Sequence, residues 1–255
     1  MLDVVQGLSI VIEHAGQVMI YDTGLSTPSG FSMADIAIQP FMLDKNIKHI
    51  DHLIISHNDN DHAGGLQYLL ATNRIDRLTL GENVNYQLSH PYSYCKQGES
   101  WSWGQVRIDV LHPPLKWQSD SNNQSCVIHI IHPKWRILLA GDIEEDVESL
   151  LVDQYDQQLK SDLIIVPHHG SRSSSSQILI DHVQPSYAVI SAGINNRYGH
   201  PHSVIVMRYL DAGTSVLTTA TAGAIRFKFD HTGMHTPESY AEQSRRYWHS
   251  VRNRL

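Results

Sequence analysis

The segment SHNDNDHAGG, residues 56–65, places four potential metal ligands within six positions: His57, Asp59, Asp61 and His62. Imidazoles and carboxylates both bind divalent cations. The segment follows the apolar run HLIIS and precedes the helical pattern AGGLQYLLATN, so we expect a tight turn between a buried strand and a helix. Such a turn can direct His57 and Asp59 to one point and Asp61 and His62 to a second, which suits two adjacent metal ions. Capping of the helix by Asp61 is the alternative, but a cap needs one such residue and not four.

Further candidate ligands end other predicted strands. Asp142 ends WRILLAGD and can bridge two metal ions with its two carboxylate oxygens, or cap the helix that IEEDVESLL predicts. His168 and His169 end the strand DLIIVP. We expect His168 to be the ligand and His169 to be its neighbour, with the reverse order left open. The alternative for this pair is one core histidine and one exposed histidine.

A further strand end, after YAVISAG, carries the segment NRYGHPH with Arg197, His200 and His202. We expect these side chains at or next to the metal site. His112 in VLHPP and the segment NQS, residues 123–125, are equally consistent with the site and with packing. Five other histidines occur in no comparable pattern and are interpreted as surface or core residues: His129, His132, His231, His235 and His249.

Strand patterns outnumber helical patterns along the chain. SIVIEH (9–14) and QVMIYD (17–22) predict a hairpin, and later strands are expected within 52–56, 77–80, 105–112, 125–132, 135–142, 162–170, 187–193, 215–219 and 224–229. Helices are expected at 63–73, after Asp142, at about 174–182 and at 203–213. No linker or repeat divides the chain, so residues 1–255 are predicted to form one domain, with a basic helical tail at about 236–255 that contains Arg245, Arg246, Arg252 and Arg254.

Composition limits the function further. The net charge is −7, which argues against nucleic-acid binding by lysine and arginine alone, and 17 histidines are nearly as many as the 19 lysines and arginines together. No apolar run is long enough to cross a membrane, and the first 14 residues are interpreted as a strand and not a signal peptide. Two cysteines, Cys95 and Cys126, are too few for a disulfide scaffold, and their spacing does not tell whether they pair.

HNDNDHAGG, LLAGD and PHHG resemble the metal-binding motifs of the metallo-β-lactamase superfamily, whose first motif is usually His-x-His-x-Asp-His. Asp59 stands where that motif has its second histidine. More narrowly, LDVVQG, SHNDNDHAGGL, VLHPP, NNQSCV, LLAGDIE, VPHHGSRSSSS and NRYGHPH, in that order within residues 2–230, resemble the metallo-β-lactamase-like domain of ComEC competence proteins, which bring DNA into bacteria. Val5 and Ser9 depart from the family pattern, and no histidine matches the third motif, where Asn123 or Asp120 is nearest.

The resemblance implies an α/β (α+β) fold, an αββα sandwich of two mixed sheets flanked by helices, with metals at one edge. It also implies a monomeric domain that lies on the periplasmic face of the bacterial inner membrane. Its expected partners are single-stranded DNA, bound through the phosphate backbone, and the remainder of the ComEC membrane channel. The expected role is degradation of the DNA strand that is not transported.

The expected reaction is hydrolysis of a DNA phosphodiester by two divalent cations, with Mn²⁺ favoured over Mg²⁺ or Zn²⁺ because aspartate at position 59 adds hard oxygen. The expected ligands are His57, Asp59, Asp61, His62, Asp142 and His168. His169, His200 or His202 is expected to protonate the leaving oxygen, with Asp61 also catalytic, and the expected substrate contacts are Ser171, Arg172, Arg197 and Asn123.

Two alternatives stay open. One is a zinc-dependent hydrolase of thioesters, lactones or β-lactams, which would be expected to have a nitrogen-rich ligand set and an apolar acyl pocket. The hydroxyl-rich segment SRSSSS beside the site favours a phosphate substrate instead. The other is a metal-stabilised DNA-binding module without catalysis.

Overall fold

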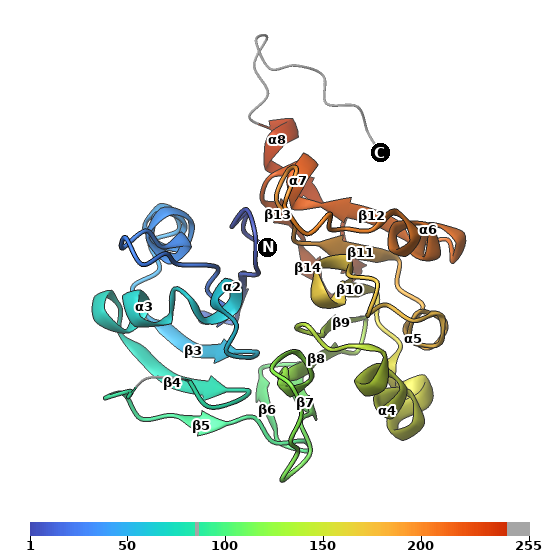
Figure 1. Cartoon of the computed structure of the whole chain (residues 1–255), viewed down its shortest axis with the longest axis horizontal. Coiled ribbons are helices and arrows are strands. Elements are labelled where there is room, and N and C mark those ends of the chain that lie inside the picture. Colours follow the sequence, from blue (N-terminus) through green and yellow to red (C-terminus); the bar gives the residue numbers. More distant parts are fainter. Residues whose placement is uncertain (85–86, 244–255) are drawn as a thin grey trace.

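Two mixed β-sheets pack face to face, and helices cover both outer faces (Figure 1). The structure, a computed structural model, describes residues 1–84 and 87–243. The four arginines of the predicted basic tail lie outside the described residues. The arrangement is the αββα sandwich that the family resemblance implies.

The first sheet has the strand order β1-β2-β3-β4-β5. β1 and β2 form the predicted antiparallel hairpin, whereas β3, β4 and β5 are added in parallel. β3 is buried on both faces from His52 to Ile55, as expected for a strand with parallel neighbours on both sides. The strands are β1 (Ile10–His14), β2 (Gln17–Tyr21), β3 (Ile50–Ile55), β4 (Ile75–Leu80) and β5 (Ser93–Tyr94).

The second sheet has the order β12-β11-β10-β9-β8-β7-β6. Strands β6 to β9 pair antiparallel, and β9 to β12 pair parallel, so the carboxyl ends of the last four strands lie at one edge. The strands are β6 (Ser100–Trp103), β7 (Val106–His112), β8 (Val127–His132), β9 (Trp135–Leu139), β10 (Leu163–Ile165), β11 (Tyr187–Ile190) and β12 (Ser215–Thr218).

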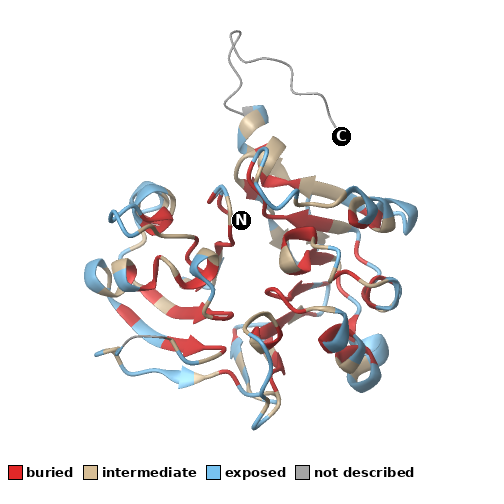
Figure 2. Cartoon of the chain, in the orientation of Figure 1, coloured by how far each residue is buried: buried red, intermediate tan, exposed pale blue. Residues whose placement is uncertain are grey.

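Three apolar clusters hold these layers together. The first lies between the sheets and includes Tyr21, Ile54 and Ile128. The second packs the second sheet against α4 (Glu145–Tyr155), α5 (Gln177–Val183) and α6 (Ser203–Asp211), and the third packs the first sheet against α1 (Gln39–Asp44) and α3 (Leu66–Thr72). Buried residues accordingly follow the strands and the inner sides of the helices in Figure 2.

Most predicted elements are present, with shifted ends. The segment 34–44 was not predicted to be helical, but it forms a π-helical turn, Ala34–Ile38, followed by α1. The remaining elements are short: α2 (Asn60–Ala63), α7 (Thr219–Ala222), α8 (Tyr240–Gln243), and the strand pairs β13 (Ile225–Arg226) with β16 (Glu238–Ser239) and β14 (Phe229–Asp230) with β15 (Gly233–Met234).

Cys95 and Cys126 form a disulfide, with their Cα atoms 5.8 Å apart. Cys95 follows β5 of the first sheet, and Cys126 precedes β8 of the second, so the bond joins the two sheets. The pairing that the sequence left undecided is thus a cross-link between layers. Within residues 1–84 and 87–243, no helix has the length and apolarity needed to cross a membrane.

Candidate metal centre

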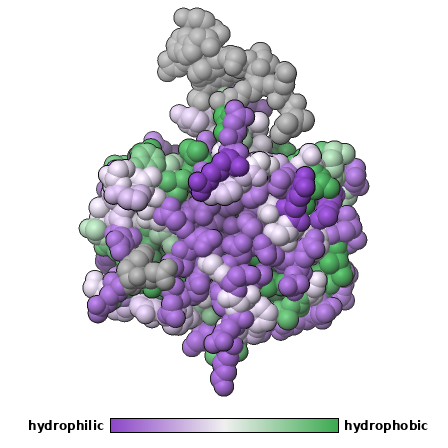
Figure 3. All heavy atoms as spheres, in the orientation of Figure 1, coloured by the Kyte–Doolittle hydropathy of each residue, from purple (hydrophilic) through white to green (hydrophobic). Residues whose placement is uncertain are grey.

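The predicted ligands gather where the carboxyl ends of strands from both sheets meet. His57 and His62 follow β3, Asp142 follows β9, and His169 follows β10. Parallel strands commonly direct side chains to a shared site at this edge. Figure 3 shows hydrophilic residues across the centre of the face drawn in Figure 1, between the two sheets.

Close backbone packing positions the segment that carries His57 to His62. Gly7 has a positive φ of +106°, and a Cβ there would lie 2.1 Å from the Asp61 carbonyl oxygen. A Cβ on Gly81 would lie 1.7 Å from the Ser56 carbonyl oxygen. Only glycine fits at either position, because any side chain would push the segment away. The LDVVQG segment near the start of the chain therefore supports the first motif directly.

Two overlapping groups of side chains can each hold a metal ion, and His62 belongs to both. In each group the ligand atoms lie within 4.8 Å of one another. His62 Nε2 lies 3.2 Å from Asp142 Oδ1, and His169 Nε2 lies 3.4 Å from both Asp142 Oδ2 and Asp61 Oδ2. The groups are His57, His62 and Asp142, and Asp61, His62 and His169. The predicted pair of Asp61 and His62 lies together in the second group, whereas Asp59, predicted to pair with His57, belongs to neither group.

Each of the three histidines in these groups has its Nδ1 engaged by an acceptor. His62 Nδ1 donates to Asp22 Oδ2 at 2.8 Å, and His169 Nδ1 donates to the Ser191 carbonyl at 2.9 Å. His57 Nδ1 lies 3.0 Å from Ser56 Oγ, whose own proton goes to Asp22. These contacts leave the Nε2 lone pairs free to bind metal.

An orphaned atom supports the fit of this donor set to a metal. His57 is fully buried, and its Nε2 has no hydrogen-bond partner. Asp59 Oδ2 is the nearest carboxylate oxygen to it, at 3.8 Å. A buried polar nitrogen without a partner is costly unless something binds it. These histidine and aspartate groups therefore suit a divalent metal ion.

Charges within the centre oppose the effect of burial. Burial disfavours ionisation of Asp142, but His62 and His169 hold the pKa of its carboxyl well below the ordinary value. Burial likewise disfavours charge on His62, but Asp142 and Asp22 raise its imidazole pKa well above the usual range. The pKa of His169 is raised by Asp142 and Asp61 in the same way. The centre therefore attracts positive charge, which protons supply in the absence of metal.

Asp22 is a supporting residue that the sequence interpretation missed. Its carboxylate is fully buried and accepts hydrogen bonds from the Ser56 backbone at 2.6 Å, from Ser56 Oγ at 2.7 Å and from His62 Nδ1. Its backbone has a positive φ of 62°, an uncommon conformation for aspartate. One signal was available, because Asp22 directly follows β2 at the edge where the other candidate residues follow their strands.

Of the two adjacent histidines after β10, the structure places His169 in a ligand group and not His168, which the sequence analysis preferred. His169 enters the ligand group, whereas His168 Nδ1 lies 3.3 Å from Glu144 Oε1 and from Ser173 Oγ. Both residues have positive φ, and this turn directs their side chains apart. The strand pattern could not reveal this turn.

The capping alternatives for the aspartates do not apply. Asp59 is at the N-cap position of α2 and Glu144 at that of α4, and neither side chain makes a capping hydrogen bond. Asp61 lies inside the first turn of α2, and Asp142 precedes α4 by three residues. The carboxylates of Asp61 and Asp142 are therefore free of capping and can serve the centre.

The position expected for a third-motif histidine is filled by hydroxyl and amide groups. Ser125 Oγ accepts the Asp142 backbone N–H at 2.9 Å and lies 3.4 Å from His57 Nδ1. Asn123 Oδ1 accepts the Glu144 backbone N–H at 2.9 Å, and Asp120 Oδ1 accepts the Asn123 N–H at 3.0 Å. Asn123, which was expected to contact substrate, thus uses its side-chain oxygen to hold the loop before α4.

The other predicted substrate and acid residues lie around the centre. His200 lies beside His168 and His169, with ring centroids 5.7 and 6.4 Å away, and His202 lies 5.4 Å from His200. Ser171 Oγ contacts Ser173 Oγ, while Arg172 and Arg197 are exposed.

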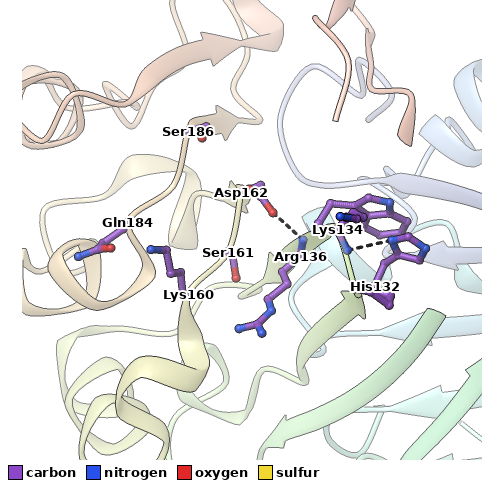
Figure 4. Close-up of a pocket in the computed structure, with 10 residues that line it drawn as sticks. His132, Lys134, Arg136, Lys160, Ser161, Asp162, Gln184 and Ser186 are labelled. Atoms are coloured by element: carbon purple, nitrogen blue, oxygen red, sulfur yellow. Dashed lines mark hydrogen bonds between the residues drawn. The ribbon is translucent and has the colours of Figure 1, made fainter. Parts of the chain in front are cut away.

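A second concavity lies at the opposite ends of β9, β10 and β11, away from the predicted residues (Figure 4). It has a volume of about 480 Å³. Asp162 accepts the backbone N–H of Arg136 at 2.8 Å there, and among the described residues none of the potential metal-ligand groups includes a residue of this concavity. The lining residues are His132, Pro133, Lys134, Trp135, Arg136, Lys160, Ser161, Asp162, Gln184 and Ser186.

Comparisons with known proteins identify the family and the fold. A family model described as the metallo-beta-lactamase superfamily matches residues 2–194. The chain is 31% identical over 234 residues to "Competence protein ComA" of Neisseria gonorrhoeae, and 35% identical over 228 residues to "Recombination protein 2" of Haemophilus influenzae. These alignments cover 91% and 89% of the chain but 32% and 28% of the relatives, so the chain spans about a third of their length.

Among solved structures, CmlA, a diiron β-hydroxylase from Streptomyces venezuelae, matches with a TM-score of 0.53 at 16% identity. The match covers 83% of this chain and 51% of that chain. A likeness at this identity concerns the fold alone. It confirms the predicted sandwich of mixed sheets and helices.

Proposed function

The chain belongs to the metallo-β-lactamase superfamily, a group of metal-dependent hydrolases, and we propose that it hydrolyses DNA phosphodiester bonds during DNA uptake. The similarity to a competence protein of Neisseria gonorrhoeae supports the DNA-uptake setting. In this proposal the chain acts on the strand that is not transported. It works together with the remainder of a membrane channel of the ComEC type.

The observation that carries the proposal is the convergence of three imidazole Nε2 atoms with two carboxylates in overlapping groups that share His62. We propose His57, Asp61, His62, Asp142 and His169 as ligands, with Asp59 beside His57. Two divalent cations bound there would supply activated water and neutralise charge on the phosphate. A phosphodiester, which carries negative charge on its non-bridging oxygens, suits such a centre.

Residues around the centre suit the handling of a phosphate chain. Arg197 and Arg172 are exposed and cationic, and Ser171, next to Arg172 in the sequence, offers a hydroxyl. Burial and the neighbouring imidazoles lower the pKa of His200 to about 4, so His200 is neutral near pH 7 and is a poor proton donor. We therefore favour His202 over His200 as the acid that protonates the leaving oxygen.

Mn²⁺ is the cation that we propose, with Mg²⁺ and Zn²⁺ as alternatives. The donor set combines the oxygens of Asp61, Asp142 and the nearby Asp59 with imidazole nitrogen. Carboxylate oxygen suits Mg²⁺ and Mn²⁺, whereas nitrogen-rich and sulfur-rich sets favour Zn²⁺. The mixed set favours Mn²⁺.

The Cys95–Cys126 disulfide supports an oxidising compartment. Disulfides persist in the periplasm and other oxidising environments and are rare in the bacterial cytosol. We therefore propose that the chain lies on the periplasmic face of the inner membrane, where incoming DNA is still accessible.

Hydrolysis of defined substrates tests the proposal. The purified chain would be incubated with single-stranded DNA, nitrocefin and a thioester, each with Mn²⁺, Mg²⁺ or Zn²⁺. We expect DNA cleavage with Mn²⁺ or Mg²⁺, and its loss in Asp61→Asn. Asp76→Asn is a matched control, because Asp76 belongs to a surface group with His49 and Asp51 whose ligand atoms are equally close.

Two outcomes would contradict the proposal. Cleavage of nitrocefin or the thioester with Zn²⁺, without DNA cleavage, would indicate an acyl-substrate hydrolase. Tight DNA binding without cleavage under any metal would indicate a non-catalytic DNA-binding module.

A further inference from the structure

The loop after β11 is held in one shape by a single side chain. Asn196 Oδ1 accepts the backbone N–H groups of Tyr198 at 3.1 Å and His200 at 3.0 Å, and its Nδ2 donates to the Gly193 carbonyl at 3.0 Å and to the His200 carbonyl. The His202 N–H donates to the Gly170 carbonyl at 3.0 Å, which ties the loop to the turn that carries His169. The rings of this loop are therefore positioned relative to the metal centre.

These rings form a row that leads out of the centre. The rings of His169 and His200 are stacked with centroids 6.4 Å apart, and those of His200 and Tyr198 are stacked with centroids 5.7 Å apart. The angles between the ring planes are 26° and 24°. His169 is buried, whereas Tyr198 is 47% exposed. The row thus begins at a proposed ligand and ends at an aromatic ring in solvent.

Arg197 adds a cation to the exposed end of the row. Its guanidinium carbon lies 4.7 Å from the centroid of the Tyr198 ring, and it hydrogen-bonds to the Tyr198 hydroxyl. The guanidinium lies over the Tyr198 ring, so a base that stacks on this ring would replace it and leave Arg197 to pair with the adjacent phosphate.

We propose that Tyr198, supported by Arg197 and His200, stacks against the base of the nucleotide next to the cleaved phosphodiester, so that the enzyme selects unpaired strands. The inference rests on the proposed nuclease function. A base within a duplex already has stacked neighbours on both sides, whereas a base in a single strand can turn onto the ring. Stacking is tolerant of sequence because every base has a flat face.

Matched oligonucleotides test the proposal. One substrate is a single-stranded thymidine oligomer, and the other has the same backbone with abasic residues throughout. KM and kcat would be measured for both with Mn²⁺, and binding to the metal-free protein would be followed by fluorescence anisotropy of an end label. We expect Tyr198→Ala to weaken binding of the thymidine oligomer and raise its KM about 10-fold, within the range for loss of one stacked base.

The same change should leave the KM for the abasic oligomer and kcat for both substrates within about threefold. Tyr198→Phe should restore the thymidine KM because it keeps the ring. Tyr92→Ala is the matched control, since Tyr92 is 45% exposed and lies beside Tyr94 near β5.

Equal losses on both oligomers would overturn the proposal, because Tyr198 would then only shape the loop. Unchanged binding of the thymidine oligomer would overturn it as well. If the wild-type protein cleaves neither oligomer, the nuclease proposal fails, and the anisotropy comparison still decides whether Tyr198 binds a base.

Discussion

Buried histidines occupy two regions of the molecule, and their pKa values move in opposite directions. In the metal centre, carboxylates raise the imidazole pKa of His62 and His169 above the ordinary value despite burial. Within the sheets, burial, aided by nearby Arg77 and Arg136 respectively, lowers the pKa of His52 to about 3 and that of His129 to about 4. The difference comes from the charged neighbours, because all four residues are buried.

The two sets also differ in which ring nitrogen is engaged. His52 Nε2 contacts Thr79 Oγ1 at 2.8 Å, and His129 Nε2 contacts Ser161 Oγ at 3.1 Å. His62 and His169 engage Nδ1 instead and direct Nε2 toward carboxylates. A histidine in the sheets thus completes a local hydrogen bond, whereas a histidine in the centre keeps a lone pair for a ligand. Burial alone does not distinguish a structural histidine from a ligand.

The strongest test of this distinction between the two sets of histidines removes His62, the residue that both ligand groups share. His62→Ala should abolish binding of both metals and lower phosphodiesterase activity by about 10³-fold or more, as expected when an assembled catalytic group is lost. Metal content by mass spectrometry and kcat/KM would be measured together. His52→Gln, a change at an equally buried histidine of the sheets, should retain metal and activity. A His62→Ala protein with normal metal content would refute the distinction between ligand histidines in the centre and structural histidines in the sheets.

Lowering the pH should reduce the folding stability through the buried histidines of the sheets. His129 has a folded pKa of about 4 against an ordinary value of 6.5, so its contribution to stability is present above pH 6.5 and is lost as the pH falls toward 4. This loss amounts to about 3 kcal/mol. Urea unfolding of chelator-treated protein at pH 7 and pH 4.5 should therefore show a smaller acid-induced loss in His129→Gln than in the wild type. Equal losses would show that His129 is not held neutral by the fold.

The supporting carboxylate should tune metal affinity without forming part of the ligand set. Asn in place of Asp22 retains its size and tolerates a positive φ, but it cannot accept all three hydrogen bonds, so the Nδ1 proton of His62 loses its acceptor. Asp22→Asn should weaken metal binding 10- to 100-fold, measured by competition with a chromogenic chelator. Asp51→Asn is the control, because Asp51 also accepts a backbone N–H, that of Val18. Unchanged affinity would limit Asp22 to a structural role.

The smallest expected effect comes from a change at His168, the neighbour of the proposed ligand His169. His168→Gln should keep its metal content and lose less than about tenfold in activity, because His168 contacts Glu144 and Ser173 and not the ligand group. His169→Gln should lose metal. If His168→Gln instead lost metal, His168 would be a ligand in the metal-bound protein, and the assignment of His169 alone would be wrong.

The fold could be predicted from the sequence where the apolar pattern was regular. The hairpin of β1 and β2, the buried strands and α6 all follow from local periodicity and turn residues. The helical segment 34–44 was missed although its buried residues, Ala34, Ile38 and Met42, recur every four positions as in a helix. The exposed apolar residues Ile36 and Leu43 and the proline at position 40 obscure this spacing in the sequence.

Residue type and position at strand ends were enough to bring His57, Asp61, His62 and Asp142 together. They were not enough to choose between His168 and His169, because that choice depends on two successive residues with positive φ. Asp22 was missed for a different reason. Its role comes from contacts with residues 34 and 40 positions away in the sequence, which no local motif displays.

The ligands come in two halves, since His57 and His62 belong to the first sheet whereas Asp142 and His169 belong to the second. The Cys95–Cys126 bond and the hydrogen bond from the Tyr21 hydroxyl to the Cys126 carbonyl, 2.7 Å long, fasten the two sheets next to this junction. In the proposed function, the chain could bind its two cations only after the sheets have packed against each other, because neither sheet carries all the residues of either ligand group.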